Sequence, residues 1–320
     1  MIGFAFQYIL DSLKSIRKYD RIRVFSFQER SRGMIQIGLT GWGDHPDVYH
    51  PSSTAKDKLL DYSAHFPIVE LDSTFYAIQP ERNIRKWIAE TPDNFRFIVK
   101  AYQGMTGHHR GELPFESINE MYDLFRLSMK PLQEAGRLAM ILVQFPPWFD
   151  CTKENVDEIR SICKRLDGFD IAIEFRHQSW YSLQFMQRTL AFLRELNVIH
   201  SVCDEPQAGQ GSIPLVPVST RGDKVLFRLH GRNVHGWRNT TGDDKAWRKV
   251  RYLYNYIEEE LDEIEMAVNK LKKEADEVFV IFNNNSGKHA AQNALRFQNK
   301  LDITYDNLAP KQLGLFEGGW

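Results

Sequence analysis

The stretch Asp170-Ile171-Ala172-Ile173-Glu174-Phe175-Arg176-His177-Gln178-Ser179-Trp180 decides the fold class. It begins with a turn residue, continues as an apolar run, and ends in Glu, Arg and His before a helix that a serine can begin. This pattern is typical of a buried parallel strand that delivers polar side chains to its C-terminal end. The same pattern recurs at residues 225–232 and 278–285. Several strands of this kind in one chain predict a single site that many strands supply.

The rest of the chain alternates between strand-like and helix-like segments. Further strands are expected at residues 35–40, 68–71, 95–100, 138–145 and 198–203, which brings the total to eight. Helices are expected at 54–65, 116–130, 153–166, 180–196 and 289–299, with one beginning near Pro80 and one of about 30 residues ending near Glu274. Eight alternating units predict a single (β/α)8 TIM barrel of the α/β class. A doubly wound open sheet is the alternative, but no strand is followed by a Gly-x-Gly-x-x-Gly fingerprint.

The composition restricts the class of protein. The 320 residues are 42% hydrophobic and 26% charged, which suits one large globular domain. The formal net charge of -1 offers no cationic surplus for a polyanion, so direct nucleic-acid binding is not expected from bulk charge. Cys151, Cys163 and Cys203 are dispersed, which disfavours disulfides and a structural zinc site. The dispersed cysteines fit a reducing cytoplasm, so we expect a cytoplasmic protein. No apolar run is long enough to span a membrane, so no membrane partner is expected.

The two ends of the chain differ from the predicted barrel domain, residues 34–300. Residues 1–33 carry seven Lys/Arg against three Asp/Glu, and Met34 immediately precedes the first strand. The hypothesis is that translation starts at Met34 and that residues 1–33 are a translated leader. A basic, partly helical N-terminal extension is the alternative. Residues 301–320 lack the helical and strand periodicity of the barrel and are predicted to be a short C-terminal tail.

Six motifs along the chain resemble those of the YecE/YunF-like family, uncharacterised TIM-barrel proteins of bacteria and archaea. They lie in order at residues 37–42, 69–76, 142–147, 173–180, 228–232 and 282–284. The resemblance covers roughly residues 35–297 and implies the barrel fold, but no settled activity. One departure is Thr106-Gly107-His108-His109, where the family tends to have Thr followed directly by His. Either His108 or His109 can therefore take the family position.

In a TIM barrel the C-terminal strand ends and the following loops form the site. Side chains two residues apart point to the same side of a strand, so Glu174 and Arg176 can both point inward, as can Arg228 and His230. We predict an enzyme that binds a small anionic molecule, such as a phosphorylated or nucleotide-derived one. The candidates for proton transfer are Glu174 and His230, followed by Asp204 and His177. The predicted ligand-binding residues are Lys100, Gln144, Arg176, Arg228, Arg232, Asn283, Asn284, Trp42 and Tyr76.

Two other interpretations of these residues stay open. Glu174–Arg176 and Asp204–Arg228 can be interior ion pairs that only hold the barrel together. Alternatively, Glu174, Asp204 and His230 can be ligands of a divalent metal in a hydrolase or isomerase, although nearby arginines would repel the ion. No cofactor is required by the sequence. No Gly-x-Ser-x-Gly elbow or Ser–His–Asp order is present, so acyl-enzyme chemistry is not expected, and hydrolase, lyase or isomerase chemistry remains.

The loop after the last strand is the best candidate for the anion site. Residues 283–287 read Asn-Asn-Asn-Ser-Gly and lead directly into a helix. Backbone N–H groups at a helix N-terminus attract anions, and barrels commonly bind phosphate after strands 7 and 8. Together with Arg232 this loop predicts an anion site, and an ordinary turn rich in asparagine is the alternative.

The C-terminal tail contains a short motif of a different kind. Gln312-Leu313-Gly314-Leu315-Phe316 is similar to the Gln-Leu-x-Leu-Phe peptide by which bacterial repair and replication proteins bind the DNA sliding clamp. Leu315 and Phe316 can be apolar anchors in a pocket, and Gln312 can form hydrogen bonds at its edge. The motif predicts, as an alternative function, a DNA-associated accessory or repair factor. Folding of these apolar residues back onto the barrel is the competing interpretation.

Overall fold

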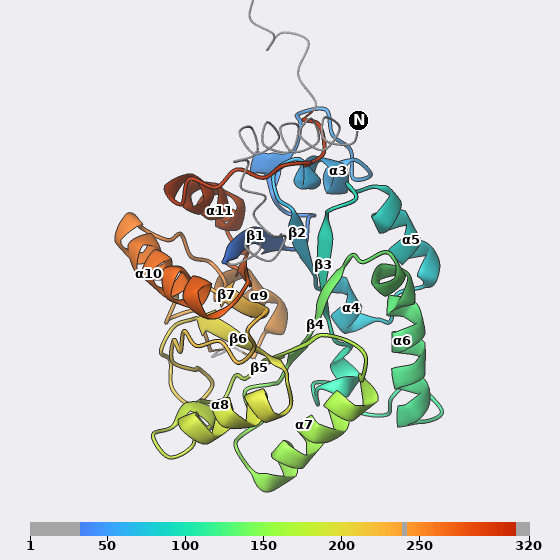
Figure 1. The fold of residues 1–320 in the computed structure, drawn as a ribbon, viewed down its shortest axis with the longest axis vertical. Helices are drawn as coiled ribbons and strands as arrows, with labels where there is room; N and C mark the ends of the chain where they lie inside the picture. Colours follow the sequence, from blue (N-terminus) through green and yellow to red (C-terminus); the bar gives the residue numbers. More distant parts are fainter. Residues whose placement is uncertain (1–32, 239–241, 312–320) are drawn as a thin grey trace, which may run out of the picture.

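The computed structural model describes residues 33–238 and 242–311. Its eight strands form one closed, all-parallel barrel in the order β1 to β8, so the predicted TIM barrel is confirmed. Figure 1 shows the helices arranged around the strands in chain order. The strands are β1 (Met34–Thr40), β2 (Ile68–Leu71), β3 (Arg96–Lys100), β4 (Leu138–Gln144), β5 (Ile171–Glu174), β6 (Ile199–Asp204), β7 (Lys224–Leu229) and β8 (Glu277–Phe282).

Two of the α-helices begin at a hydroxyl side chain that caps them. Ser117 accepts a hydrogen bond from the backbone N–H of Glu120, and Thr152 accepts one from that of Asn155, so each hydroxyl satisfies a helix donor. The α-helices are α3 (Lys58–Ser63), α4 (Ser73–Tyr76), α5 (Glu81–Ala89), α6 (Ile118–Glu134), α7 (Lys153–Arg165), α8 (Met186–Glu195), α9 (Asp244–Arg251), α10 (Glu258–Glu274) and α11 (His289–Lys300). Short 3-10 helices are η1 (Pro46–Val48), η2 (Gln103–Met105) and η3 (Gln178–Tyr181).

The apolar side chains form two layers. A small cluster fills the inside of the barrel, and a larger one lies between the strands and the helices. The strands are therefore apolar on both faces, which explains why most of them read as continuous apolar runs. The inner cluster contains Ile68, Ile98, Ala139, Met140, Leu142, Ala172, Ile199, Leu226, Phe279 and Ile281.

Three predicted helices are wrong in length. The helix expected at 180–196 is confined to Met186–Glu195, after the separate 3-10 helix Gln178–Tyr181. The helix expected at 54–65 is confined to Lys58–Ser63, because hydrogen-bonded turns precede it, with Thr54 donating to the Asp57 carboxylate. The 30-residue helix before the last strand is two helices, α9 and α10, separated by residues 252–257. In this break the backbone N–H of Tyr256 donates to the Asn293 side chain rather than to a helical carbonyl, and the Tyr256 hydroxyl donates to Asp204 and accepts from the Gly231 N–H.

Neither end of the chain outside residues 33–311 is described. The hypothesis about residues 1–33 and the motif at 312–316 therefore lie outside the described residues. Within 33–238 and 242–311, no helix combines the length and apolarity that crossing a bilayer requires.

Candidate functional site

Strand alternation brings five ionisable side chains together inside the C-terminal end of the barrel. Glu70 on β2, Glu174 and Arg176 at the end of β5, and Arg228 and His230 at the end of β7 all point inward and are at most 1% exposed. Glu70, Glu174 and Arg228 each lie two residues beyond an apolar side chain of the inner cluster, and Arg176 and His230 follow two residues later on the same side, as the periodicity of a strand requires. The prediction that these pairs share a face is confirmed.

Arg228 is the centre of this buried cluster. Its Nε and Nη2 donate to the two oxygens of Glu70 at 2.8 and 2.5 Å, and its Nη1 lies 2.9 and 2.8 Å from the two oxygens of Glu174. One guanidinium thus joins β2, β5 and β7 through two carboxylates, a geometry to which its planar fork is suited. The interpretation of Arg228 as an interior ion-pair residue is the one that the geometry supports.

Arg176 extends the cluster to His230 and to a further carboxylate. Its Nε donates to Glu174 at 2.7 Å, its Nη1 to Glu205 at 2.8 Å, and its Nη2 lies 2.9 Å from Nε2 of His230. Since a guanidinium can only donate, Nε2 of His230 must accept, and the proton of a neutral imidazole lies on Nδ1. Nδ2 of Asn283 lies 2.9 Å from that Nδ1, and turning the amide by 180° would place its oxygen there as the acceptor that Nδ1–H requires.

Glu174 and His230 are each held in one protonation state. Burial alone raises the pKa of Glu174, but Arg176 and Arg228 outweigh it and hold that pKa well below its usual range. Burial and the same two arginines lower the pKa of His230 well below that of a free histidine. A group that exchanges protons near neutrality needs a pKa near the working pH. The structure therefore favours positioning roles for these two residues rather than the proton transfer that we predicted.

Glu205 is the buried residue that sequence reasoning missed. Its Oε1 accepts a hydrogen bond from the backbone N–H of Ile213 at 2.7 Å, and its side chain has no exposed surface. Burial raises the pKa of Glu205 to about 7, although Arg176 opposes the change. Ser201, Cys203 and Glu205 have the same parity along β6 and beyond it, and Ser201 donates to Glu174 at 3.0 Å. The sequence offers no signal for the position of Glu205, because polar residues of β6 occur on both faces of the strand.

A layer of cations and aromatic rings, formed by Trp237, Trp247, Arg251 and Tyr252, lies next to Arg176 of the buried cluster. Trp237 has the guanidinium of Arg176 at 5.5 Å and that of Arg251 at 4.7 Å from its ring centre. Arg251 also lies 4.5 Å from the ring of Trp247 and 5.2 Å from that of Tyr252. Its Nε is buried without a hydrogen-bond partner, and no described carboxylate lies within 4.0 Å of it.

The cations at this mouth of the barrel also lower the pKa values of two neighbouring side chains, Tyr252 and His108. Burial raises the pKa of the Tyr252 phenol, but Arg251, Arg176, Lys100 and Arg228 outweigh it and lower that pKa below its ordinary value. Burial, followed by Lys100, Arg176 and Arg251, lowers the pKa of His108 to about 3. Both residues therefore experience a positive potential that the nearby carboxylates do not cancel.

The structure places Lys100 at this mouth, as predicted. Its Nζ lies 3.4 Å from Asp72 and 4.7 Å from the ring centre of Phe75. Of the two adjacent histidines, His108 packs against Phe75, whereas Nε2 of His109 lies 2.9 Å from the carbonyl of Glu112. Gln144 lies two residues beyond Leu142, so its side chain also points into the barrel, and it pairs with Glu174 of the neighbouring strand β5.

Several other predicted site residues lie elsewhere. Asp204 follows Cys203 directly and therefore points to the other face of β6. Arg232 and Tyr256 bind it there, so the expected Asp204–Arg228 pair is wrong. Nδ1 of His177 accepts a hydrogen bond from the Ser179 N–H and caps η3. Trp42 packs edge-on against Trp87, with 5.4 Å between ring centres.

The predicted anion site at residues 283–287 is not supported. Arg232, which was to complete it, donates to Asp204 through Nε and Nη2, and to Glu263 through Nη1. Asn284 donates to the carbonyl of Tyr254 and to Asn293, which joins the loop to the α9–α10 break. Arg232 is thus fully engaged by carboxylates, although the amide oxygen of Asn284 has no partner among the described residues, and the cation without a described carboxylate partner, Arg251, lies at the mouth instead.

A metal site of the predicted composition is also not supported. The ligand atoms that lie within 4.8 Å of one another belong to Glu174, Cys203 and His230, and Asp204 is not among them. Both oxygens of Glu174 already accept hydrogen bonds from guanidinium groups at 2.7–2.9 Å. Two guanidinium cations at this distance would repel a divalent ion, so the donor set does not fit one.

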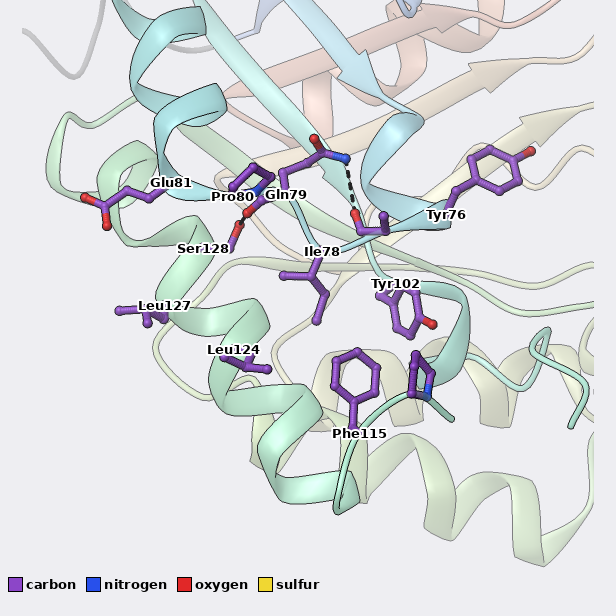
Figure 2. Close-up of a pocket in the computed structure, with 12 residues that line it drawn as sticks. Tyr76, Ile78, Gln79, Pro80, Glu81, Tyr102, Phe115, Leu124, Leu127 and Ser128 are labelled. Carbon is purple, nitrogen blue, oxygen red and sulfur yellow. Dashed lines mark hydrogen bonds between the residues drawn. The ribbon is translucent and has the colours of Figure 1, made fainter. Parts of the chain in front are cut away.

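An apolar groove of about 460 Å³ lies beside the mouth. Ile78, Tyr102, Phe115 and Leu124 converge on it from the loops after β2 and β3 and from α6 (Figure 2). The predicted rim residue Tyr76 lies at its edge and is 56% exposed. None of the mouth cations lines this groove, so it is a separate surface feature.

Comparison with known proteins places the chain in one family. The model "Protein of unknown function DUF72" matches residues 36–314. The chain is 54% identical over 283 residues to the UPF0759 protein YunF of Bacillus subtilis, which covers 88% of this chain and 100% of that protein. It is also 27% identical over 161 residues to YecE of Escherichia coli, covering 49% of this chain and 54% of YecE.

Solved structures agree with this assignment. A crystal structure of a DUF72 family protein from Enterococcus faecalis has a TM-score of 0.81 at 41% identity, covering 88% of this chain and 100% of that one. A DUF72 family protein from Thermotoga maritima has a TM-score of 0.71 at 31% identity, covering 84% and 100%. Motifs, family model and fold all agree, and the chain belongs to the DUF72 family, which includes YunF and YecE and has no assigned function.

Proposed function

We propose that this protein is an enzyme that binds a small anionic ligand at the mouth of the barrel, between Lys100 and Arg251. The observation that carries the proposal is Arg251, whose buried Nε has no hydrogen-bond partner. Buried polar groups without partners are rare, and an absent ligand is one of the few physical reasons for them. Arg176, Arg228 and Arg232 differ from it, because each of them donates to carboxylates.

We further propose that Tyr252 transfers a proton to or from the ligand, in a lyase or isomerase type of reaction. Four cations lower the pKa of its phenol, and Tyr252 lies beside His230, with 6.0 Å between ring centres. A phenol of lowered pKa is a stronger acid, and its phenolate persists closer to neutrality. Glu174, Arg228 and His230 then position Arg176 beneath the ligand. A cytoplasmic location, predicted from the dispersed cysteines, which are free, belongs to the same proposal.

Replacing Arg251 with alanine should weaken the binding of inorganic phosphate about tenfold or more, because a charge-assisted hydrogen bond contributes about 1.5–3 kcal/mol. Isothermal titration calorimetry at constant ionic strength measures this dissociation constant. Arg251→Lys should retain part of the affinity. The matched control is Arg296→Ala on α11, which removes a surface guanidinium paired with Glu258. Equal phosphate affinity in wild type and in folded Arg251→Ala would sink the proposed anion site.

A second candidate function is attachment to the DNA sliding clamp through residues 312–316. The observation that favours it is the position of the segment just before them. The Ala309 N–H donates to the carbonyl of Ser63, in the connection that leads into β2, so this segment lies at the barrel end opposite the mouth. A partner bound to the following residues would leave the mouth open, and such a tether would raise the local concentration of the protein at DNA.

A synthetic peptide of residues 308–320 should bind the purified clamp, and the same peptide with Leu315→Ala and Phe316→Ala should not. Fluorescence anisotropy of the labelled peptides measures both affinities. Loss of binding is expected because Leu315 and Phe316 are the proposed apolar anchors. Failure of the native peptide to bind, or equal binding by the two peptides, would rule out this function.

A further inference from the structure

A row of aromatic side chains lies across the mouth from Arg251 and Tyr252. It comes from the loops after β2, β3 and β4, which face the β7–β8 side in a closed eight-stranded barrel. Ring centres are 5.2 Å apart for Tyr76 and Phe75, 5.0 Å for Phe75 and His108, and 6.0 Å for His108 and Trp148. The row runs from Lys100, which lies over Phe75, to Trp148 at the outer edge.

Trp148 presents its indole to solvent from a fixed backbone. Its side chain is 54% exposed, whereas its neighbours Phe145 and Phe149 are buried and stacked with 4.0 Å between ring centres. Pro146 and Pro147 restrict the backbone on one side. An exposed indole that is held rigidly can bind a flat ligand without a large loss of side-chain entropy.

Arg110 provides a cation next to this indole. Its guanidinium carbon lies 5.4 Å from the ring centre of Trp148, and no described carboxylate lies within 4.0 Å of Arg110. The contact demonstrates that a planar group fits against this ring, and a heterocyclic base can take its place. The mouth therefore combines an exposed stacking surface on one side with Arg251, which has no described carboxylate partner, on the other.

We propose that the ligand of the mouth is a nucleotide, whose base stacks on Trp148 while its phosphate binds between Lys100 and Arg251. This inference rests on the proposed function and names its substrate class. Nucleic-acid-binding proteins use the same two elements, because every base has a π face and every phosphate is an anion. His108 lies between the two parts: it contacts Trp148 and is within electrostatic reach of Arg251. The same chemistry can come from a free nucleotide or from the end of a single strand.

The test compares adenosine 5′-monophosphate with ribose 5-phosphate, which carries the same phosphate and no base. The wild type should bind the nucleotide roughly tenfold more tightly, and the tryptophan fluorescence should be quenched as the base stacks. Trp148→Leu should lose this preference and retain its affinity for ribose 5-phosphate.

The outcomes separate this inference from the proposed function. Equal affinity for the nucleotide and for ribose 5-phosphate, both dependent on Arg251, would overturn the nucleotide and leave the anion site intact. Absence of phosphate, ribose phosphate and nucleotide binding would overturn both. A preference for the nucleotide that survives in Trp148→Leu would overturn the role of Trp148. A further titration with oligothymidylate and with thymidine monophosphate distinguishes the two origins of the ligand. Tighter binding of the oligothymidylate indicates the end of a single strand, and equal or weaker binding indicates a free nucleotide.

Discussion

Replacing Arg228 with alanine should lower the free energy of unfolding by about 3–5 kcal/mol, and this is the largest effect that we expect of one substitution. Arg228 is 1% exposed and is the cation that contacts Glu70, whose side chain has no exposed surface. Without the guanidinium, a carboxylate would stay buried without a compensating charge, or would have to take up a proton. Denaturation by urea, followed by circular dichroism, measures the change.

A compensated variant distinguishes this explanation from a loss of packing alone. Glu70→Gln combined with Arg228→Met removes both charges and keeps similar volumes, so it should recover most of the lost stability, because buried ion pairs are often replaceable by neutral groups. Arg296→Ala, on the surface, should cost less than about 1 kcal/mol. The explanation fails if the double variant is as unstable as Arg228→Ala, or if Arg228→Ala costs no more than the surface control.

Replacing Glu205 with glutamine should change the pH dependence of stability by about 3 kcal/mol. Burial raises the pKa of Glu205 from the ordinary value of 4.5 to about 7 in the folded protein. The folded protein therefore keeps a proton that the unfolded chain has lost between these pH values. The stabilisation from this proton is fully present below about pH 4.5 and is lost as the pH rises through 7. Relative to wild type, Glu205→Gln should thus become more stable between pH 4.5 and 8.

Free energies of unfolding of both proteins, measured every half pH unit by urea denaturation, test this sign. Glu263→Gln serves as the control for loss of a carboxylate, because Glu263 is 62% exposed and is also paired with an arginine. A constant difference between Glu205→Gln and wild type would mean that Arg176 keeps Glu205 ionised at all these pH values. A difference that changes in the opposite direction would mean that the ion pair outweighs burial.

The sequence by itself determined the fold and four of the five residues of the buried cluster. Eight apolar runs alternating with helical patterns are sufficient for a barrel, and the motifs identified the family. The residues Glu174, Arg176, Arg228 and His230 could be placed on one face because each pair follows an apolar strand at a spacing of two. Lys100 was placed at the mouth by the same argument. These inferences needed only local periodicity.

Only the tertiary structure shows which set of alternating residues of β6 faces the inside of the barrel. Both faces of this strand carry polar residues. His200 and Asp204 lie on one face, and Ser201, Cys203 and Glu205 lie on the other. In a parallel barrel both faces of a strand are buried, so apolar residues do not mark the inner face. Only the contacts of Glu205 with Arg176, and of Asp204 with Arg232 and Tyr256, assign the two sides.

Tertiary structure also decided the break between α9 and α10. The local pattern favours one long helix, because its charged and apolar residues follow a helical period. The hydrogen bonds of Tyr256 to Asp204 and Gly231 come from a strand end about 25–50 residues earlier, and these outweigh the local preference. Arg251 and Tyr252 reach the mouth only because the helix stops there. The sequence thus predicted where the site lies, and long-range contacts determined which residues are free to bind in it.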